Sequence, residues 1–421
     1  MPINISRRAA LGVPLALATS AWMSGTSWAE PGFTGIDKDA CRAAGIDPAA
    51  MVGVSDHFSG MIGDTLHPGA QLAVVKNDHL LAFFAAGHDD DNKPVDRHSV
   101  ICMLSCTKLL ATQVMAHLHD QGVFEFSDKI AKHWPEFAAN GKQDITIAQL
   151  MSHRAGLASS VYGDYGQWQE WEKPGGIEKL IVDMSPVWPP GTANGYHALT
   201  FGHVVESLVR RWTKKTTGEV LREQITGPLG IKDVYLGLPR DVYDTRYAKL
   251  MANDFAQRTN ELNSAGFTNP PDAGKTFFNS YTILRQSLPW GGGVANAADF
   301  AQLLGVYANK GTLRGKTIFS AATFDYLSTP TNKPEDVDRL LKRHVHWGTG
   351  LMIDQSEGVG IMEGPVFGTA ASPRTVGHLG GSSAMAWADP ANGVSLVFLS
   401  TRAPPGPKYQ ALSNVVRTAI G

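Results

Sequence analysis

A serine and a lysine three residues apart are the first candidates for chemistry in this chain. Ser105 and Lys108 follow the apolar run 99–104 and begin an amphipathic stretch that continues to Gln121. Residues three apart on a helix share a face, about one turn apart. A serine hydroxyl is a poor nucleophile until a base takes its proton, and a lysine can be that base if burial or a nearby positive charge keeps its amine neutral. The spacing therefore predicts Ser105 as a nucleophile and Lys108 as its base, at a helix N-terminus whose dipole favours developing negative charge.

The elements that must position this pair divide into β-type ends and a helical middle. Residues 71–76 and 80–86 are apolar β-type runs around the turn 77–79, which predicts a hairpin. Further strands are expected over 351–353, 384–388 and 394–400, and helices over 39–64, 108–121, 299–304 and from Pro407 onward. Residues 125–290 carry helical patterns with little strand alternation. This order predicts an α+β fold, in which an antiparallel sheet from both ends of the chain is flanked by helices and carries an inserted helical lobe.

The first 29 residues predict an export signal rather than part of the fold. Arginines at positions 7 and 8 precede an apolar run over about 9–22, and small residues lead to a predicted cleavage site after Ala29. The run is shorter than the ~20 residues that a membrane-spanning helix needs. The arginine pair favours twin-arginine export, with the general secretory route as the alternative. We expect residues 30–421 to form one domain that is periplasmic or secreted.

Composition excludes several classes of protein. The chain has 421 residues, 43% of them hydrophobic, and a formal net charge of −2. These values are ordinary for a globular protein and give no electrostatic reason to expect a nucleic-acid or membrane partner. Cys41, Cys102 and Cys106 are too few for a disulfide framework, and we expect three buried, unpaired thiols.

Competing catalytic arrangements are weaker. There is no G-x-S-x-G elbow, no H-E-x-x-H or zinc-type cysteine pair, and no phosphate-binding or dinucleotide-binding glycine motif. Ser152 and His153 are adjacent, so on a helix their side chains point apart. Cys106 is only two residues from Lys108 and faces elsewhere. We therefore expect no metal and no cofactor.

Several segments in order carry a family resemblance. The segment PGAQLAVVKNDHLLAFFAAGHDDDNKPVDRHSVICMLSCTK, which contains Ser105 and Lys108, resembles the N-terminal half of the serine β-lactamase-related family. That family includes class C β-lactamases, serine D,D-peptidases and family VIII carboxylesterases. The resemblance continues through DQGVFEFSDKIAKHWPEFAANGKQDITIAQLMSHRAGL, PPGTANGYHALTFGHVVESLVRR, PWGGGVANAADFAQLL and GHLGGSSAMAWADPANGVSLVFLSTR, and covers nearly all of residues 65–402. It implies a β-lactamase/transpeptidase-like fold and a serine hydrolase that works through an acyl-enzyme, with a motif pattern closest to the esterase-like members.

The second family motif implies a catalytic tyrosine. Tyr196 matches the tyrosine whose phenol exchanges protons with the nucleophile and the leaving group. The usual pattern is Y-x-N, whereas this chain reads Tyr196-His197-Ala198. Ala198 cannot donate the amide hydrogen bond that an asparagine gives to a peptide-like substrate.

The third motif is a strand triad that is commonly Lys-Thr-Gly and here reads His378-Leu379-Gly380. The glycines allow close approach of the strand to a ligand. By resemblance, the backbone N–H groups of Gly381 and Ser105 form the oxyanion hole. Trp290 begins the string 290–293, similar to a glycine-rich loop near the site of family VIII esterases; the string also fits a tight turn before a helix.

The two departures from the family pattern favour esters. Ala198 lacks the amide donor, and His378 is mostly neutral at pH 7 with an ordinary pKa near 6.5. We predict a carboxylesterase acting on small esters. The alternatives are β-lactamase or D,D-peptidase (penicillin-binding) activity on β-lactam-like or peptide substrates, and a catalytically inactive cell-wall-binding relative.

Overall fold

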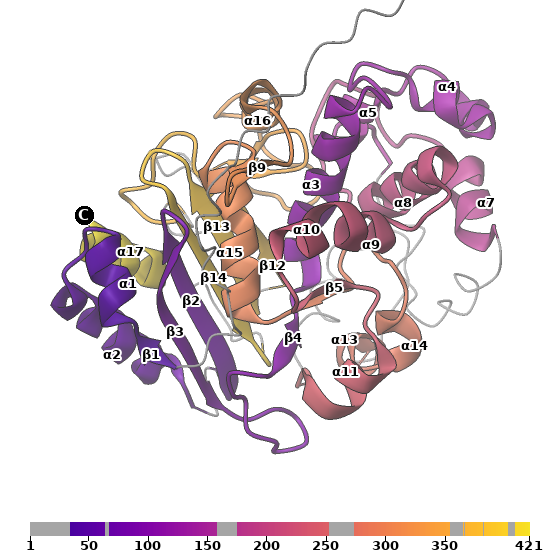
Figure 1. Ribbon diagram of the computed structural model, residues 1–421. Helices are drawn as coiled ribbons and strands as arrows, with labels where there is room; N and C mark the ends of the chain where they lie inside the picture. The colour runs from indigo at the N-terminus through magenta and orange to yellow at the C-terminus, as the bar shows by residue number, and fades with distance from the viewer. Residues whose placement is uncertain are drawn as a thin grey trace, which may run out of the picture.

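A large antiparallel sheet forms one half of the protein, and its strands come from both ends of the chain (Figure 1). The computed structural model describes residues 34–63, 67–157, 175–251, 273–353, 365, 367–381, 383–402 and 409–421. In spatial order the strands are β1 (Gly35–Ile36), β3 (His79–Gly87), β2 (Gly69–Lys76), β14 (Val394–Ser400), β13 (Ala384–Asp389), β12 (Val376–Gly380), β11 (Met352–Ile353) and β10 (His346–Trp347). All neighbours pair antiparallel. The predicted hairpin and the predicted C-terminal strands are confirmed.

Helices cover both faces of this sheet, which explains why its central strands are apolar on both sides. In β2, Leu72 and Val74 belong to the core cluster that also contains residues of α1 (Lys38–Ala43), α2 (Val52–Met61) and α17 (Tyr409–Ile420). Ala73 and Val75 belong to the other core cluster, which includes α15 (Ala297–Ala308). Successive side chains on a strand point to opposite faces, so this alternation buries both faces of β2.

The N-terminal helical segment is two helices rather than the single one that we expected. α1 ends at Ala43, and Gly45 has φ +75°. Asp47 then caps a 3-10 turn that begins with Pro48, and α2 follows from Val52. Proline lacks the N–H that a continuous helix needs, and glycine adopts left-handed φ without strain, so the chain turns here.

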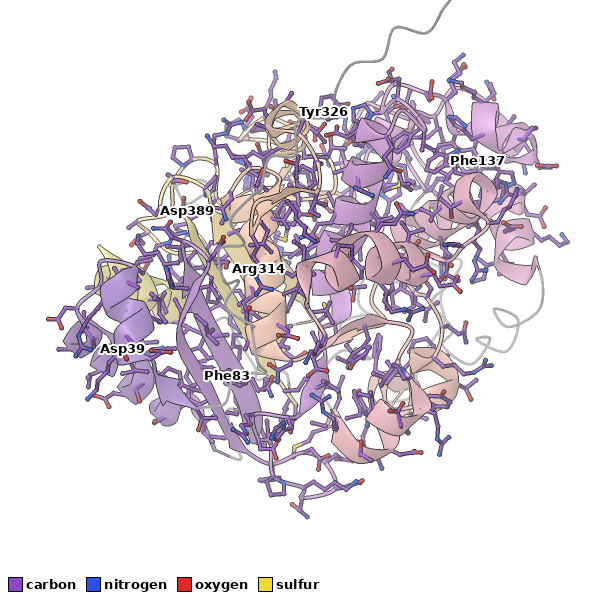
Figure 2. All side chains as sticks on the ribbon, in the orientation of Figure 1. Asp39, Phe83, Phe137, Arg314, Tyr326 and Asp389 are labelled. Carbon is purple, nitrogen blue, oxygen red and sulfur yellow. The ribbon has the colours of Figure 1, made fainter. Side chains whose placement is uncertain are left out.

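The second half of the protein is a helical lobe packed against α3 (Thr107–Asp120). Its other members are α4 (Ile130–His133), α5 (Ile147–Met151), α7 (Gly176–Asp183), α8 (Thr200–Thr213), α9 (Thr217–Val220), the π-helical segment Leu221–Thr226 and α10 (Gly227–Leu229). Phe83 on the sheet and Phe137 in the lobe, both labelled in Figure 2, belong to one continuous core cluster. The sheet and the lobe therefore share a core, and the predicted α+β fold with an inserted lobe is confirmed.

A small second sheet lies between the two halves, where the sequence predicted little strand. Its order is β5 (Val234–Leu236), β7 (Gly293–Ala295), β4 (Val100–Cys102) and β6 (Tyr247–Ala248). β4 pairs antiparallel with β7 but parallel with β6. Strands of two or three residues are too short to show alternation in a sequence, and the partners are far apart along the chain. The remaining described elements are α11 (Arg240–Arg246), α13 (Ala273–Phe278), α14 (Tyr281–Leu284), β8 (Thr312–Leu313), β9 (Lys316–Thr317) and α16 (Ala321–Leu327).

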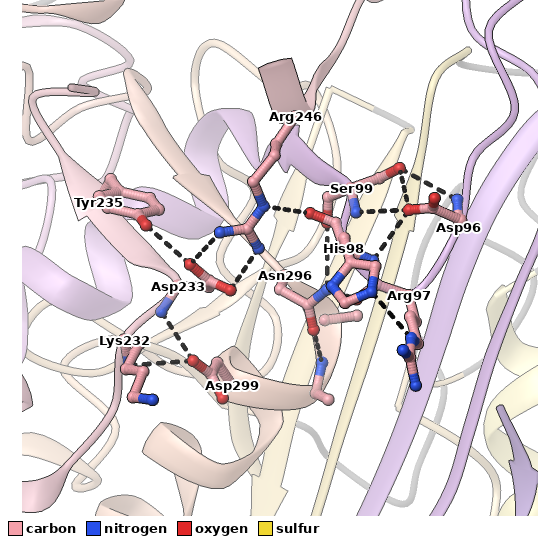
Figure 3. Close-up of polar contacts among 12 residues, drawn as sticks. Asp96, Arg97, His98, Ser99, Lys232, Asp233, Tyr235, Arg246, Asn296 and Asp299 are labelled. Carbon is pink, nitrogen blue, oxygen red and sulfur yellow. Dashed lines mark hydrogen bonds and ion pairs between the residues drawn. The ribbon is translucent and has the colours of Figure 1, made fainter. Parts of the chain in front are cut away.

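A polar network locks this small sheet to the loop before β4 (Figure 3). Arg246 pairs with both carboxylate oxygens of Asp233 and donates from Nε to the His98 carbonyl at 2.7 Å. Asn296 donates from Nδ2 to the carbonyls of Arg97 and Ser99, at 2.8 and 3.1 Å. The strand that leads to Ser105 is thus held at its start by charged and amide side chains.

Three further expectations can be compared with the described residues. Cys41, Cys102 and Cys106 are buried and unpaired, as predicted. Residues 1–29 lie outside the described part of the chain. Within the described ranges, no helix has the length and apolar character needed to cross a membrane.

Candidate active site

Ser105 lies on a strained turn between a strand and a helix. The 3-10 turn Leu104–Cys106 follows β4 and leads directly into α3. Leu104 has φ +46°, which residues with a side chain rarely adopt and which costs about 1–3 kcal/mol. Thr107 holds the turn: its Oγ1 donates to the Leu104 carbonyl at 2.5 Å and accepts from the Gly293 N–H at 2.9 Å. The result is a serine that is partly exposed between buried neighbours.

The Lys108 amine is buried next to this serine and is held by two carbonyls. The residue is 1% exposed. Its Nζ donates to the Trp290 carbonyl at 2.7 Å and to the Ala198 carbonyl at 2.9 Å, and lies 3.4 Å from Ser105 Oγ. Among the described residues, no carboxylate forms an ion pair with Lys108. The predicted pairing of Ser105 with Lys108 on one helical face is present.

These surroundings favour a neutral lysine. Burial lowers the pKa of Lys108 well below its usual value. A neutral amine has two N–H bonds and one lone pair. The two carbonyls accept the two N–H groups, so the lone pair remains for the Ser105 hydroxyl proton. The geometry is that of a base prepared to activate a nucleophile.

Tyr196 completes this group from the loop before α8. The Lys108 Nζ lies 4.9 Å from the centre of the Tyr196 ring. Burial raises the pKa of the Tyr196 phenol, whose oxygen has no hydrogen-bond partner among the described residues. The phenol therefore keeps its proton at neutral pH and can pass one between the serine and a leaving group. The structure brings all three predicted side chains together.

Buried histidines support the tyrosine loop instead of forming a second catalytic pair. Ser152 Oγ donates to the Ala148 carbonyl at 2.7 Å, and His153 Nδ1 accepts from the His197 N–H at 3.1 Å. His197 Nε2 accepts in turn from the Leu157 N–H at 2.9 Å. The Ser152–His153 pair is thus occupied by structural contacts, in line with the sequence interpretation.

The end of strand β12 packs directly on the nucleophile turn. A Cβ at Gly380 would lie 2.3 Å from the Met103 carbonyl oxygen, so only glycine allows this approach. Cys106 Sγ donates to the His378 carbonyl at 3.1 Å and fixes the strand to the turn. Gly381 follows with φ +48°, a value that favours glycine. This packing puts Gly381 beside the turn that carries Ser105, as an oxyanion hole made by the two backbone N–H groups requires.

His378 is buried and uncharged. Burial lowers its pKa to about 3. Its Nδ1 donates to the Leu379 carbonyl at 2.6 Å, which leaves Nε2 as an acceptor. Nε2 is buried and has no hydrogen-bond partner among the described residues. The site therefore lacks a cation at this position, and it offers an acceptor where β-lactamases commonly have a lysine.

Trp290 acts through its carbonyl. The loop 289–290 approaches α8 so closely that a Cβ at Gly202 would lie 2.2 Å from the Trp290 nitrogen. This approach brings the Trp290 carbonyl to Lys108. A Cβ at Gly293 would lie 2.7 Å from Thr107 Oγ1. The glycine-rich string is thus both the turn into β7 and a support for the base.

Two residues that sequence analysis did not identify contact Tyr196, and a third affects its pKa. The Trp347 ring stacks on the Tyr196 ring, with centroids 5.5 Å apart and planes at 4°. Asp338 accepts hydrogen bonds from the Tyr196 N–H and from Trp347 Nε1, at 3.1 and 3.0 Å. The positive charge of Arg343 lowers the pKa values of Tyr196 and His378. No motif surrounds these residues, and no cluster suited to a metal ion occurs in the described ranges.

Comparisons with known proteins agree with this geometry. The family model described as Beta-lactamase matches residues 54–419. The Esterase/beta-lactamase LipL of Mycobacterium tuberculosis is 28% identical over 327 residues, which are 73% of this chain and 71% of the relative. A putative D-alanyl-D-alanine carboxypeptidase of Escherichia coli K12 is 26% identical over 388 residues, with 80% of this chain and 79% of the relative covered. The crystal structure of a family VIII carboxylesterase has a TM-score of 0.73 at 26% identity and covers 88% of this chain and 96% of its own.

Proposed function

This chain belongs to the Beta-lactamase family of serine hydrolases, and we propose that it is a carboxylesterase that hydrolyses small esters through an acyl-enzyme on Ser105. The observation that carries the proposal is the Lys108 amine, buried between two carbonyls and 3.4 Å from Ser105 Oγ. An amine in those surroundings serves as a base rather than as a surface charge.

The first half of the proposed reaction forms the acyl-enzyme. Lys108 takes the Ser105 hydroxyl proton while Oγ attacks the ester carbonyl carbon. The carbonyl oxygen becomes an oxyanion that accepts hydrogen bonds from the N–H groups of Ser105 and Gly381. The carbon–oxygen bond to the leaving alcohol then breaks, and Tyr196 passes to the alkoxide a proton that Lys108 replaces.

The second half returns the enzyme to its starting state. A water molecule attacks the acyl carbon and gives up a proton to the same base. The bond to Ser105 Oγ breaks, Oγ recovers its proton, and the carboxylic acid leaves. One ester and one water give one alcohol and one acid, with no metal or cofactor in either half.

Two features support an ester over an amide substrate. Ala198 presents a methyl group and a carbonyl already bonded to Lys108, where an asparagine could hold a substrate amide. The neutral ring of His378 replaces a permanent cation. A site without an amide donor and a permanent cation gains no binding energy from a substrate amide or carboxylate, whereas an ester can react without those contacts.

A second candidate function, on β-lactams or D-alanyl peptides, is favoured by Arg343. Both substrate classes carry a carboxylate near the scissile bond, and the positive charge of Arg343 lowers the pKa values of both Tyr196 and His378. An Arg343→Gln variant separates the two functions. It would leave a neutral ester unaffected but lower kcat/KM for a carboxylate-bearing substrate.

The direct test compares p-nitrophenyl butyrate, nitrocefin and a D-Ala-D-Ala peptide as substrates of the same preparation. We expect the ester to have the highest kcat/KM and Ser105→Ala to remove its turnover without changing the folded state. A higher kcat/KM for nitrocefin or the peptide would replace the proposal with the second candidate. No turnover of any substrate, with no fluorophosphonate labelling of Ser105, would point to an inactive cell-wall-binding relative.

We further propose that residues 1–29 are a twin-arginine export signal and that residues 30–421 form one serine hydrolase domain, periplasmic or secreted. The support is the arginine pair, the short apolar run and the small residues before Ala29. N-terminal sequencing of the exported protein should begin at Glu30. Retention of residues 1–29 on a cytoplasmic protein would overturn this proposal.

A further inference from the structure

A buried carboxylate lies behind the catalytic tyrosine, on a segment that belongs to none of the family motifs. Asp338 is 1% exposed and precedes strand β10. Its Oδ1 accepts from the N–H groups of Tyr196, Leu340 and Leu341, at 3.1, 2.9 and 2.9 Å. Its Oδ2 accepts from Trp347 Nε1 at 3.0 Å. Four N–H donors therefore converge on one buried carboxylate, and no described residue forms an ion pair with it.

The four donors are of two kinds. Leu340 and Leu341 belong to the same tight loop as Asp338, which is also closed by a bond from the Lys342 N–H to the Asp338 carbonyl at 2.9 Å. These bonds organise the loop itself. Tyr196 and Trp347 belong to the catalytic site, so the other two bonds connect the loop to the site.

The connection constrains Tyr196 at both its ends. At the main chain, Asp338 Oδ1 holds the Tyr196 N–H. At the ring, Asp338 Oδ2 holds the indole of Trp347, and that indole stacks on the phenol with planes at 4°. Trp347 also contacts the ring of His153 with a centroid distance of 4.3 Å, so the indole cannot tilt freely. One side chain thus fixes the position of the phenol and the plane of its ring.

We propose that Asp338 is a positioning residue for Tyr196, which holds the phenol where it can exchange a proton with Ser105 and the leaving group. The inference rests on the proposed function of Tyr196. Proton transfer depends steeply on the distance and direction between donor and acceptor, so a phenol free to rotate or shift loses rate more than binding.

The first test is Asp338→Asn, which keeps the shape and replaces one acceptor oxygen by an NH₂ that cannot accept from Trp347 Nε1. We expect kcat for p-nitrophenyl butyrate to fall at least tenfold while KM stays within twofold. The matched control is Asp89→Asn. Asp89 is also 1% exposed and accepts from the N–H groups of Asp91, Lys93 and Lys249, at 2.9, 2.9 and 3.0 Å. It makes no contact with the catalytic side chains, so its variant should keep the wild-type kcat.

The second test is Trp347→Phe, which keeps an aromatic ring that can stack and removes the indole N–H together with the five-membered ring. We expect a two- to fivefold fall in kcat. Its control is Trp387→Phe, which makes the same change in the same core cluster. Trp387 Nε1 donates to Ser413 Oγ on α17 at 3.1 Å, and not to a residue of the site. In the double variant of Asp338→Asn with Trp347→Phe, the loss should be smaller than the product of the two single losses, because both act on one connection.

The outcomes separate this proposal from the proposed function. If the wild-type protein shows no Ser105-dependent ester turnover, the function itself fails. If turnover is Ser105-dependent and Asp338→Asn keeps the wild-type kcat, the positioning role is wrong. If Asp338→Asn does not fold, Trp347→Phe decides alone: a kcat equal to that of Trp387→Phe contradicts the proposal, and a selective fall supports it.

Discussion

Two buried basic side chains in this protein have opposite surroundings. Arg417, on α17 behind the large sheet, pairs with Asp389 at 2.5 Å, and the two side chains are 4% and 0% exposed. Arg417 also donates to the Phe367 carbonyl at 2.8 Å and lies over the Trp387 ring. Lys108, at the site, has two carbonyls, a serine and an aromatic ring, and no described carboxylate.

The comparison shows that a buried basic side chain can either stabilise the fold or become available as a base, depending on its partners. A buried charge with a carboxylate and satisfied N–H groups stays charged and joins elements. A buried amine given only neutral acceptors loses its proton, because nothing compensates the charged form. The pair Arg417–Asp389 is structural for the first reason, and Lys108 is available as a base for the second.

Removing the amine should give the largest effect on activity and little effect on the fold. We expect Lys108→Met to lower kcat/KM for p-nitrophenyl butyrate about 10⁴-fold, which is about 5.5 kcal/mol of transition-state stabilisation. A methionine of similar length leaves no unpaired charge, so the midpoint of thermal unfolding should stay or rise. A large loss of stability in this variant would mean that Lys108 is charged in the folded protein.

Replacing Arg417 should have the opposite effects, a large loss of stability and no loss of activity. Arg417→Met leaves the Asp389 carboxylate buried without its partner, and we expect the free energy of unfolding to fall by about 3–5 kcal/mol. Ester turnover per folded molecule should be unchanged, because Arg417 lies behind the sheet. Urea unfolding and kcat measured on one preparation test both statements, and a stability equal to wild type would contradict the comparison.

The two regions should also respond to acid in different pH windows. Burial lowers the pKa of His197 to about 4 in the folded protein, whereas its unfolded pKa is near 6.5. Between pH 6.5 and 4 the unfolded chain therefore binds the proton and the folded protein does not. The free energy of unfolding falls as the pH falls through this range. Burial would raise the pKa of Asp389, but hydrogen bonds from Ser372 and Arg417 outweigh it and hold the pKa below its usual value. The stabilisation by the ionised Asp389 carboxylate is present above its unfolded pKa near 3.9, and it is lost only as the pH falls through the lower pKa of the folded protein.

Urea unfolding from pH 7 to pH 3 measures these windows. The free energy of unfolding should begin to fall below pH 6.5, and His197→Asn should flatten the slope between pH 6.5 and 4. A wild-type stability that is constant down to pH 4 would be evidence against a buried neutral His197.

The smallest expected effect concerns substrate choice at the lysine. Ala198→Asn adds an amide next to the carbonyl that holds Lys108. One added hydrogen bond is worth about 0.5–1.5 kcal/mol, so kcat/KM for butyryl p-nitroanilide should rise about 2–10-fold while the ester rate changes little. Ala198→Leu adds similar volume without a donor and should give no rise. Equal changes with both variants would show that shape, and not the amide, matters here.

The sequence predicted the parts of the site that depend on local spacing. Ser105 and Lys108 are three residues apart, so their spacing alone indicates them, whereas Tyr196 was predicted through the resemblance to the family's second motif. Asp338 reaches Tyr196 across 142 residues, from a segment with neither periodicity nor a motif, so no local pattern could identify it.

The same limit applies to the fold. β2, β3 and β14 have seven or more residues, and their apolar runs predict them. The small sheet has strands of two or three residues, held by long-range pairing and by the Arg246–Asp233 network, which no alternation in the sequence reveals. The break at Gly45 and Pro48 could have been read from the residues, because both disfavour a continuous helix.

The pairing of β2 with β14 has a consequence for the order in which activity appears during synthesis. Ala73 of β2 lies opposite Val397 of β14, so the centre of the sheet cannot close until residue 400 has left the ribosome. β12, which brings Gly381 to the serine turn, is held in the sheet by β13 and so waits for the same event. The growing chain thus contains Ser105 and Lys108 early, but the Trp290 carbonyl that holds the Lys108 amine follows 182 residues later, and the strands that place Gly381 close only after residue 400. An incomplete chain therefore lacks the arrangement of Gly381 beside the serine turn that the full-length fold provides.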